Sequence, residues 1–219
     1  YRVSHAMMRE TLYEEIFAPL RIRLHQRVGR AIEGAYAGLL EQHAAELAEH
    51  FANSSSEEDL ARALEYSEMA AGHAQSVYSY GEAARLLEQA LRVQQLLDPN
   101  DKAKRCDLLI ALGEVMKPTG QSLRAYEVVV PEAFSLADAL GDADRASLAC
   151  RLAMEAAQRF TGGAMGQAPE YRLWAERADR SAAPGTRHRV LADLAMSIVR
   201  RMSGDLGGAW RLRKRALEL

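Results

Sequence analysis

Small residues recur along this chain at a fixed interval, and that recurrence restricts the fold more than any other feature. Ala125 lies 42 residues after Ala83, and Ala209 lies 84 residues, or two such intervals, after Ala125. A period of about 20–50 residues is typical of arrays in which each unit is one pair of helices stacked on the next. Such arrays present a long surface to a partner. The interval therefore favours an interaction protein over an enzyme.

Alanines seven residues apart predict where these helices touch. Ala83 and Ala90, and likewise Ala209 and Ala216, are about two helical turns apart and so lie on one face. Only a small side chain lets a neighbouring helix come close there, because a larger one overpacks the contact. The repeat-packing residues predicted from this pattern are Ala83, Ala90, Gly113, Gly120, Ala125, Ala133, Gly204, Ala209 and Ala216.

The middle unit departs from this spacing at a proline. Ala125 and Ala133 are eight residues apart, and Pro131 lies between them. Proline inside a helix removes one backbone hydrogen bond and clashes with the preceding turn. A π-bulge or a kink accommodates one extra residue, so we expect one of the two near Pro131. We interpret it as a structural adjustment in preference to a functional hinge.

Turn-forming residues divide the chain into helices. Gly, Pro, Asn and Asp cluster at breaks such as 98–101 and 118–120, and Ser55 with Glu58 fits a capping box for a helix that starts near Glu57. The expected helices cover residues 5–17, 19–37, 39–52, 57–77, 80–97, 101–117, 121–140, 144–160, 169–181, 187–203 and 206–219.

We therefore predict an all-α fold. Residues 1–55 form an N-terminal helical segment, and residues 56–219 form about four antiparallel helix pairs wound into a right-handed superhelix. The helix over 19–37 has one apolar stripe, because its apolar residues recur every four positions. They are Leu20, Leu24, Val28, Ile32 and Tyr36.

Composition excludes several classes of protein. Ala, Leu, Arg and Glu dominate the 219 residues, only 6 of which are proline, and this balance favours helix. A net charge of −2 gives no general attraction to nucleic acid or anionic lipid. No apolar run is long enough to cross a bilayer, and no secretory signal opens the chain. Cys106 and Cys150 lie in apolar stretches, so we expect two reduced, buried thiols in a cytoplasmic protein.

The last unit resembles the second half of a tetratricopeptide repeat. The matching residues are Gly204, Ala209, Ala216 and Leu217. The first-helix and turn positions of the same repeat look like Leu112, Gly113, Gly120 and Ala125. The resemblance implies stacked helix pairs around a groove, for which Tyr78, Tyr80, Tyr126 and Arg200 are candidate lining residues. For most of the tyrosines on these helices, packing between helices is the preferred interpretation.

The N-terminal part resembles a family of large bacterial signalling proteins. The likeness is carried by YRVSHAMMRETLY at 1–13, RLHQRV at 23–28 and AELAEHF at 45–51. These segments are similar to STAND-type signalling ATPases, which include large ATP-binding LuxR-type transcription regulators and ATPase-linked adenylate or guanylate cyclases. The resemblance implies that residues 1–4 end a winged-helix module, and that the repeats sense a partner or effector. We accordingly expect the chain to be part of a longer protein.

No catalytic or metal-binding constellation is expected. His43, Glu46 and His50 share a helix face, but the two histidines are about 10 Å apart along the axis, too far to share one zinc ion comfortably. The glycine-rich segment 162–166 lacks the lysine of a phosphate-binding loop. We therefore expect neither enzymatic activity nor a cofactor or metal in this chain.

Basic stripes leave nucleic-acid binding as an alternative. They comprise Arg23, Arg27 and Arg30, and then Arg200, Arg201, Arg211, Arg213, Lys214 and Arg215. Acidic residues balance them nearby and no aromatic residues interleave, so solvated helix faces are the preferred interpretation.

The sequence thus predicts a non-catalytic interaction and regulatory module of a bacterial signalling or transcription-regulating ATPase. Its groove is expected to bind a protein, a peptide, a small effector or the parent ATPase module, and no membrane contact is expected. A DNA-associated part of a transcription regulator and a structural homo-oligomerisation arm are the alternatives.

Overall fold

The computed structural model describes residues 11, 13–161 and 168–218 of the chain. Every regular element in this part is helical, which confirms the all-α prediction for the described residues. The chain divides into two compact units, Tyr1–Pro99 (unit 1) and Asn100–Leu219 (unit 2).

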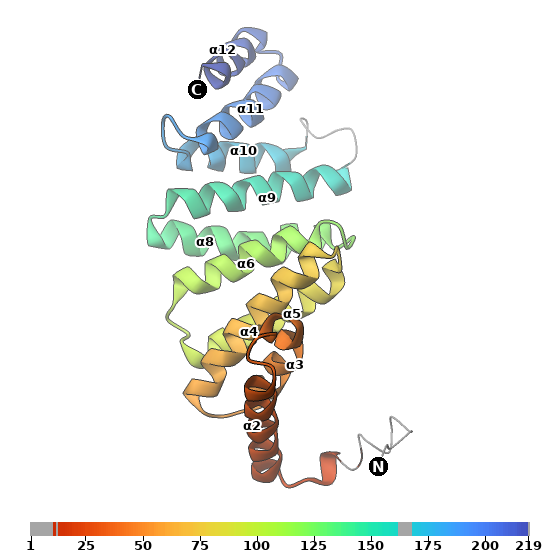
Figure 1. Cartoon of the computed structure of the whole chain (residues 1–219). Coiled ribbons are helices and arrows are strands. Elements are labelled where there is room, and N and C mark those ends of the chain that lie inside the picture. The colour runs from red at the N-terminus through yellow and green to blue at the C-terminus, as the bar shows by residue number, and fades with distance from the viewer. Residues whose placement is uncertain (1–10, 12, 162–167, 219) are drawn as a thin grey trace. The chain divides into compact units, whose positions relative to one another are not determined.

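In the part of unit 1 that the structure describes, the long helices are four. They are α2 (Ala18–Ala35), α3 (Leu40–Ala52), α4 (Glu57–Ser76) and α5 (Tyr80–Leu97) (Figure 1). Each packs mainly on its neighbours along the chain, with α3 on α4 and α4 on α5 as the largest interfaces. The core of the unit lies where α3, α4 and α5 meet, and contains Leu47, Phe51 and Leu86.

The first turn of α4 corrects one prediction. Ser56 has an extended backbone, and its hydroxyl accepts a hydrogen bond from the Asp59 backbone N–H at 3.2 Å. The capping box expected on Ser55 and Glu58 is therefore wrong by one residue. Three serines precede this helix, and only the one with extended geometry directly before the first turn can cap it.

Unit 2 contains the remaining helices, which also pack on their neighbours along the chain (Figure 1). They are α6 (Lys102–Met116), α7 (Ser122–Arg124), η1 (Ala125–Val129), α8 (Val130–Leu140), α9 (Ala143–Thr161), α10 (Pro169–Ser181), α11 (Arg187–Met202) and α12 (Leu206–Leu217). Besides these contacts, α6 also touches α9.

The proline-containing stretch holds the expected π-bulge. The π-helix η1 ends two residues before Pro131, which occupies the first turn of α8, where the missing N–H is not needed. A π-turn takes up one residue more than an α-turn, so Ala125 and Ala133 are both buried although they are eight residues apart. The proline and the irregular spacing thus have one structural cause.

The expected helix bounds agree with the described helices to within two residues, apart from the bulge. The helix expected over 5–17 lies largely outside the described residues, although residues 13–15 have helical backbone. The glycine-rich segment at 162–166 also lies outside them. The structure therefore describes ten of the eleven expected helical segments in full or nearly so.

The predicted packing residues fall into two groups. Six alanines and one glycine are buried in helices: Ala83, Ala90, Gly113, Ala125, Ala133, Ala209 and Ala216. A Cβ on Gly113 would lie 3.3 Å from Leu152 Cδ1, so α6 and α9 approach closely there. Gly120 and Gly204 instead lie exposed in turns with φ of +77° and +86°, a backbone that only glycine adopts without strain.

Enlarging a buried alanine should destabilise unit 1. We expect Ala83→Leu to lower the free energy of unfolding by about 1–3 kcal/mol, because the helix packed against this fully buried position cannot move away without cost. Ala61→Leu, on the exposed side of α4, is the matched control and should change it by less than about 0.5 kcal/mol. Urea denaturation followed by circular dichroism measures both, and equal effects would contradict the prediction.

Candidate functional site

The helix α2 is attached to unit 1 through its polar side. Asp59 of α4 is fully buried and accepts hydrogen bonds from Gln26 Nε2 at 2.7 Å and from Ser54 Oγ at 2.8 Å. Burial alone would raise the pKa of this carboxyl group. Hydrogen bonds from Ser54, Ser56 and Gln26, together with the charge of Arg30, outweigh that effect and hold the pKa below its usual value. Asp59 is therefore an ionised, fully partnered anchor for α2.

A second polar contact and one close approach complete this attachment. Glu33 accepts hydrogen bonds from the Tyr66 hydroxyl at 2.6 Å and from Arg62 Nη1 at 2.9 Å. Gly29 is the buried residue of α2, and a Cβ there would lie 3.0 Å from the ring of Phe51. Polar groups and a glycine therefore make the principal contacts of α2 with α3 and α4.

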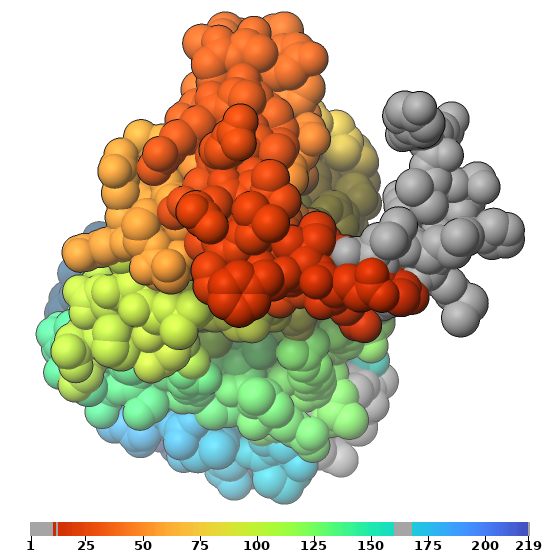
Figure 2. Space-filling model, turned by 90° about the horizontal axis from the view of Figure 1, so that it is seen from below, coloured from red at the N-terminus to blue at the C-terminus, as the bar shows by residue number. Residues whose placement is uncertain are grey.

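Most of the apolar stripe of α2 faces away from the unit, and we call Leu20, Leu24, Val28, Ile32 and Tyr36 the α2 apolar face. Tyr36, at its C-terminal end, stacks on the His43 ring of α3, with ring centroids 3.9 Å apart. Leu20, Leu24, Val28 and Tyr36 are between 38% and 44% exposed. A hollow of about 480 Å³ lies along the face, lined by Leu24, Arg27, Val28, Ala31, Ile32, Ala35 and Tyr36. Figure 2 looks onto this end of unit 1, where α2, in red to orange, lies at the surface. This face is the principal candidate for an interaction site.

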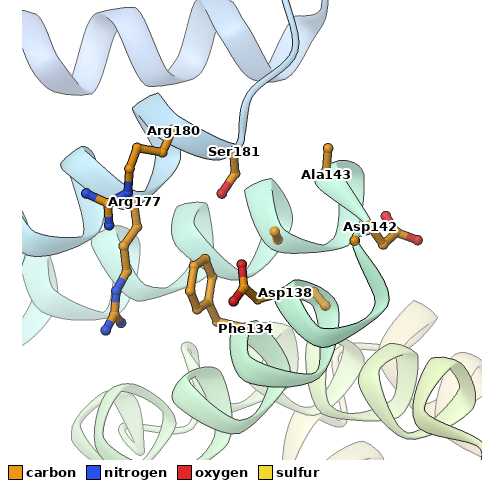
Figure 3. Close-up of a pocket in the computed structure, with 10 residues that line it drawn as sticks. Phe134, Asp138, Asp142, Ala143, Arg177, Arg180 and Ser181 are labelled. Carbon is orange, nitrogen blue, oxygen red and sulfur yellow. The ribbon is translucent and has the colours of Figure 1, made fainter.

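A more polar cavity of about 570 Å³ lies in unit 2 between α8, the start of α9 and α10. Figure 3 shows Arg177 and Arg180 of α10 on one side of it and Asp138 of α8 on the other. The Arg177 guanidinium lies over the Phe134 ring, 5.0 Å from its centroid. Asp142 at the rim is bound to neighbouring Arg145, whose backbone and side-chain hydrogen bonds lower the pKa of the Asp142 carboxyl. The cavity offers charge and an aromatic surface but no activated nucleophile.

The other charged groups of unit 2 are largely used in joining helices. Arg145 of α9 binds Asp107 of α6 with two hydrogen bonds, of 2.7 and 2.8 Å. Further along the same pair of helices, Arg151 binds Glu114, and Lys117 binds Glu155. These groups neutralise one another, so the α6–α9 contact has a structural role.

The last two helices are joined in the same way. Asp193 of α11 is fully buried and binds Arg189 of its own helix at 2.8 Å and Arg215 of α12 at 2.5 Å. Burial opposes ionisation of this carboxyl group, but the two arginines outweigh it and lower the pKa. Arg215 belongs to one of the basic stripes of the sequence, and it is therefore partly committed to holding α12.

The cysteines offer no reactive group. Cys106 and Cys150 are free and buried, as predicted. Burial raises the pKa of Cys106 to about 11 and that of Cys150 to about 12, so both thiols stay protonated near neutral pH. A protonated, inaccessible thiol is neither a nucleophile nor a metal ligand.

Of the four residues predicted to line a groove, two lie in unit 1 and two in unit 2. Tyr78 and Tyr80 of unit 1 touch edge to face, with ring centroids 6.1 Å apart, and Tyr78 is 78% exposed. In unit 2, Tyr126 packs against the ring of Trp174, while Arg200 is exposed and lies 3.6 Å from Asp205. Tyr126 therefore takes part in helix packing.

The histidines do not form a metal site in the described part of the chain. His43 lies 3.6 Å from Glu46, but His50 faces His25 of α2, with their Nδ1 atoms 2.9 Å apart. The Tyr13 hydroxyl forms a 2.7 Å hydrogen bond with the other ring nitrogen of His25. No group of three or more potential ligands that could hold a metal ion occurs among the described residues.

No protein-family model matches the chain, and a search among curated proteins finds no match. Among the described helices, none combines the length and apolar character that crossing a bilayer requires.

Two features of these surfaces were not anticipated from the sequence. The stripe on α2 was recognised, but its pattern does not say whether it meets the same chain or a partner. The cavity beside Arg177 and Arg180 brings together residues of α8 and α10 that are about forty positions apart, and no local spacing signals it. The sequence could have pointed to the buried Asp59, because this residue lies three positions after the serine that caps α4.

The close approach of α2 to α3 can be tested with two glycines of the same helix. Gly29→Ala should lower the free energy of unfolding by about 1 kcal/mol, because overpacking against the Phe51 ring outweighs the gain in helix propensity. Gly34→Ala meets open space and should raise it by up to about 1 kcal/mol. Thermal and urea denaturation measure both variants, and stabilisation by both would show that α2 does not pack in this way.

Acidification should loosen the contact between α2 and α3. Burial, followed by the charges of His50 and Arg21, lowers the pKa of His25 below its ordinary value of 6.5, although Glu49 opposes this. The unfolded chain therefore binds the proton first, and stability is lost as the pH falls below about 6.5. From about pH 7 to about pH 5, the wild-type free energy of unfolding should fall more than that of His25→Gln.

The matched control for this experiment is His73→Gln. His73 is exposed on α4 and its nearest carboxylate, on Glu41, is 3.7 Å away. This variant should keep the pH dependence of the wild type in urea denaturation. If His25→Gln kept it as well, the pH dependence would have to arise elsewhere.

Proposed function

We propose that this chain is a non-catalytic, protein-binding module of stacked helix pairs that acts within a larger bacterial signalling or transcription-regulating ATPase. The observation that carries the proposal is the α2 apolar face. A monomeric protein rarely leaves a contiguous apolar surface uncovered unless it is used for binding. Here the face stays exposed because the opposite, polar side of α2 provides the attachment to unit 1.

The array of helices supports this function. Consecutive helices pack on one another within each unit, and small residues are buried at many of the predicted contacts. Such packing is compatible with a right-handed, tetratricopeptide-like superhelix, whose usual role is to display binding surfaces. The resemblance of residues 1–13, 23–28 and 45–51 to STAND-type ATPases supplies the proposed parent, for which the module would sense a protein partner.

The chemistry of the described residues also favours binding over catalysis. Asp59, Asp193 and the charged groups between α6 and α9 are engaged with oppositely charged or hydrogen-bonding neighbours. The buried thiols are protonated. The DNA-binding alternative is weakened by Arg215, which is bound to Asp193. The remaining alternative is a structural arm, in which the α2 apolar face meets a second copy of the chain.

Site-specific crosslinking tests the proposal. A photoreactive amino acid at Leu24, in cells producing the whole protein, should give a discrete adduct with another protein. The adduct should disappear when Val28→Asp is added, because a carboxylate in the middle of the face opposes burial. The same probe at Ala61, exposed on α4, is the control and should give no such adduct. An adduct with the mass of two copies would favour the structural arm, and no adduct at Leu24 would contradict the proposal.

A further inference from the structure

Charge is distributed unevenly around the α2 apolar face. Arg23 and Arg27 are exposed along one edge and have no hydrogen bond or ion pair with any described residue. Arg21 lies on the other edge with its guanidinium over the Tyr13 ring, 4.9 Å from the centroid, a contact that leaves its charge in place. The single carboxylate of α2, on Glu33, is on the opposite side of the helix and bound to Arg62. The face is therefore apolar along its centre, and the exposed charges that α2 itself places along its two edges are positive.

The shape of the face fits a helix. Tyr36 lies sixteen positions after Leu20, so the stripe extends over about 24 Å along the helix axis. Ala31 and Ala35 contribute only methyl groups and so produce the hollow of about 480 Å³ between the larger side chains. Large side chains of one helix pack into such depressions on another. A partner helix of four to five turns would cover the stripe.

We infer that the α2 apolar face docks an amphipathic helix whose own apolar stripe is edged by aspartate and glutamate. The inference rests on the proposed protein-binding function and names the chemistry of the partner. The apolar stripes supply the buried area, and the carboxylates meet Arg23 and Arg27 on one edge and Arg21 on the other.

A second copy of this chain fits the face less well. If two copies of α2 paired through their stripes, each exposed edge would bring arginines toward arginines, with no exposed carboxylate of α2 to separate them. Like charges brought together at an interface disfavour association.

An anionic membrane matches the charge but not the shape. Helices that lie in a membrane surface insert bulky residues such as tryptophan, phenylalanine and leucine. The centre of this face is instead hollowed at Ala31 and Ala35. A rigid partner with protruding side chains fills such a hollow, whereas the stripe offers a bilayer little to insert at that point.

Two designed peptides of about eighteen residues test the inference. They share one leucine stripe at helical spacing, and differ in having either glutamate or lysine along both edges. Fluorescence anisotropy at low salt, with the whole chain, should show about tenfold tighter binding of the glutamate peptide, because three exposed charge pairs are attractive in one case and repulsive in the other. Val28→Asp should abolish binding of both peptides.

Charge reversal provides the decisive variant. The double variant Arg23→Glu, Arg27→Glu should weaken the glutamate peptide and favour the lysine peptide. The double variant Arg201→Glu, Arg211→Glu changes the net charge equally at exposed positions of unit 2 and should keep the wild-type preference. Circular dichroism should show unchanged helix content in both variants.

Four results would overturn the inference. Equal affinity for the two peptides would contradict the proposed acidic edges of the partner helix. The face would then bind helices whatever the charge along their edges. Binding of neither peptide would remove the helix as the occupant, and the crosslinking experiment would still decide the protein-binding function independently. Concentration-dependent doubling of the mass in light scattering, lost in Val28→Asp, would assign the face to a second copy. Binding to phosphatidylglycerol vesicles, lost in the same variant, would assign it to a membrane.

Discussion

The orientation of α2 depends on the buried carboxylate of Asp59. If α2 rolled about its axis to bury its apolar stripe, Gln26 would leave Asp59, and Glu33 would leave Arg62 and Tyr66. Removing a partner from a buried charge costs about 3–5 kcal/mol. The half-exposed side chains of the stripe would regain about 1 kcal/mol each on full burial. The hydrogen bonds to Asp59 and Glu33 therefore oppose the burial of the apolar stripe and favour the observed orientation of α2.

Unit 2 uses the same interaction at its last helix. Asp193 is buried in α11, as Asp59 is in α4, and Arg215 reaches it from α12. In both units a helix is therefore held against its neighbour by a directional, charged contact. Apolar packing alone would allow such a helix to slide or roll, since the hydrophobic effect has no preferred direction. The buried carboxylates specify one orientation, and thus which side chains remain on the surface, including the exposed Leu206 and Trp210 of α12.

Local pattern was sufficient to predict most of the described helices and the bulge at Pro131. Turn residues, alanine spacing and a proline determine the backbone within a few positions of themselves. At Ala125 and Ala133 the structure has the burial and the bulge that these local features predict. The direction of the α2 stripe was not predictable in this way, because it depends on Asp59, more than thirty residues from Gln26. The groove expected at Tyr78, Tyr80, Tyr126 and Arg200 followed from a family resemblance, and it stays a prediction because two of these residues lie in each unit. The choice among three consecutive serines as the cap of α4 required the backbone geometry of Ser56.

The two sides of α2 have separable roles. A partner on the α2 apolar face would bury Leu24 and Val28 without disturbing Gln26 or Glu33, which point to the other side of the helix. Binding would therefore stabilise the existing orientation of α2 and would not compete with its attachment. Partner binding can affect a larger protein only if α2 has a second orientation. The partner must then bind the two orientations of α2 with different affinities. Protonation of His25, at the contact with α3, would weaken the inner attachment while leaving the outer face intact. Partner binding and acidification would then act on the same helix in opposite directions.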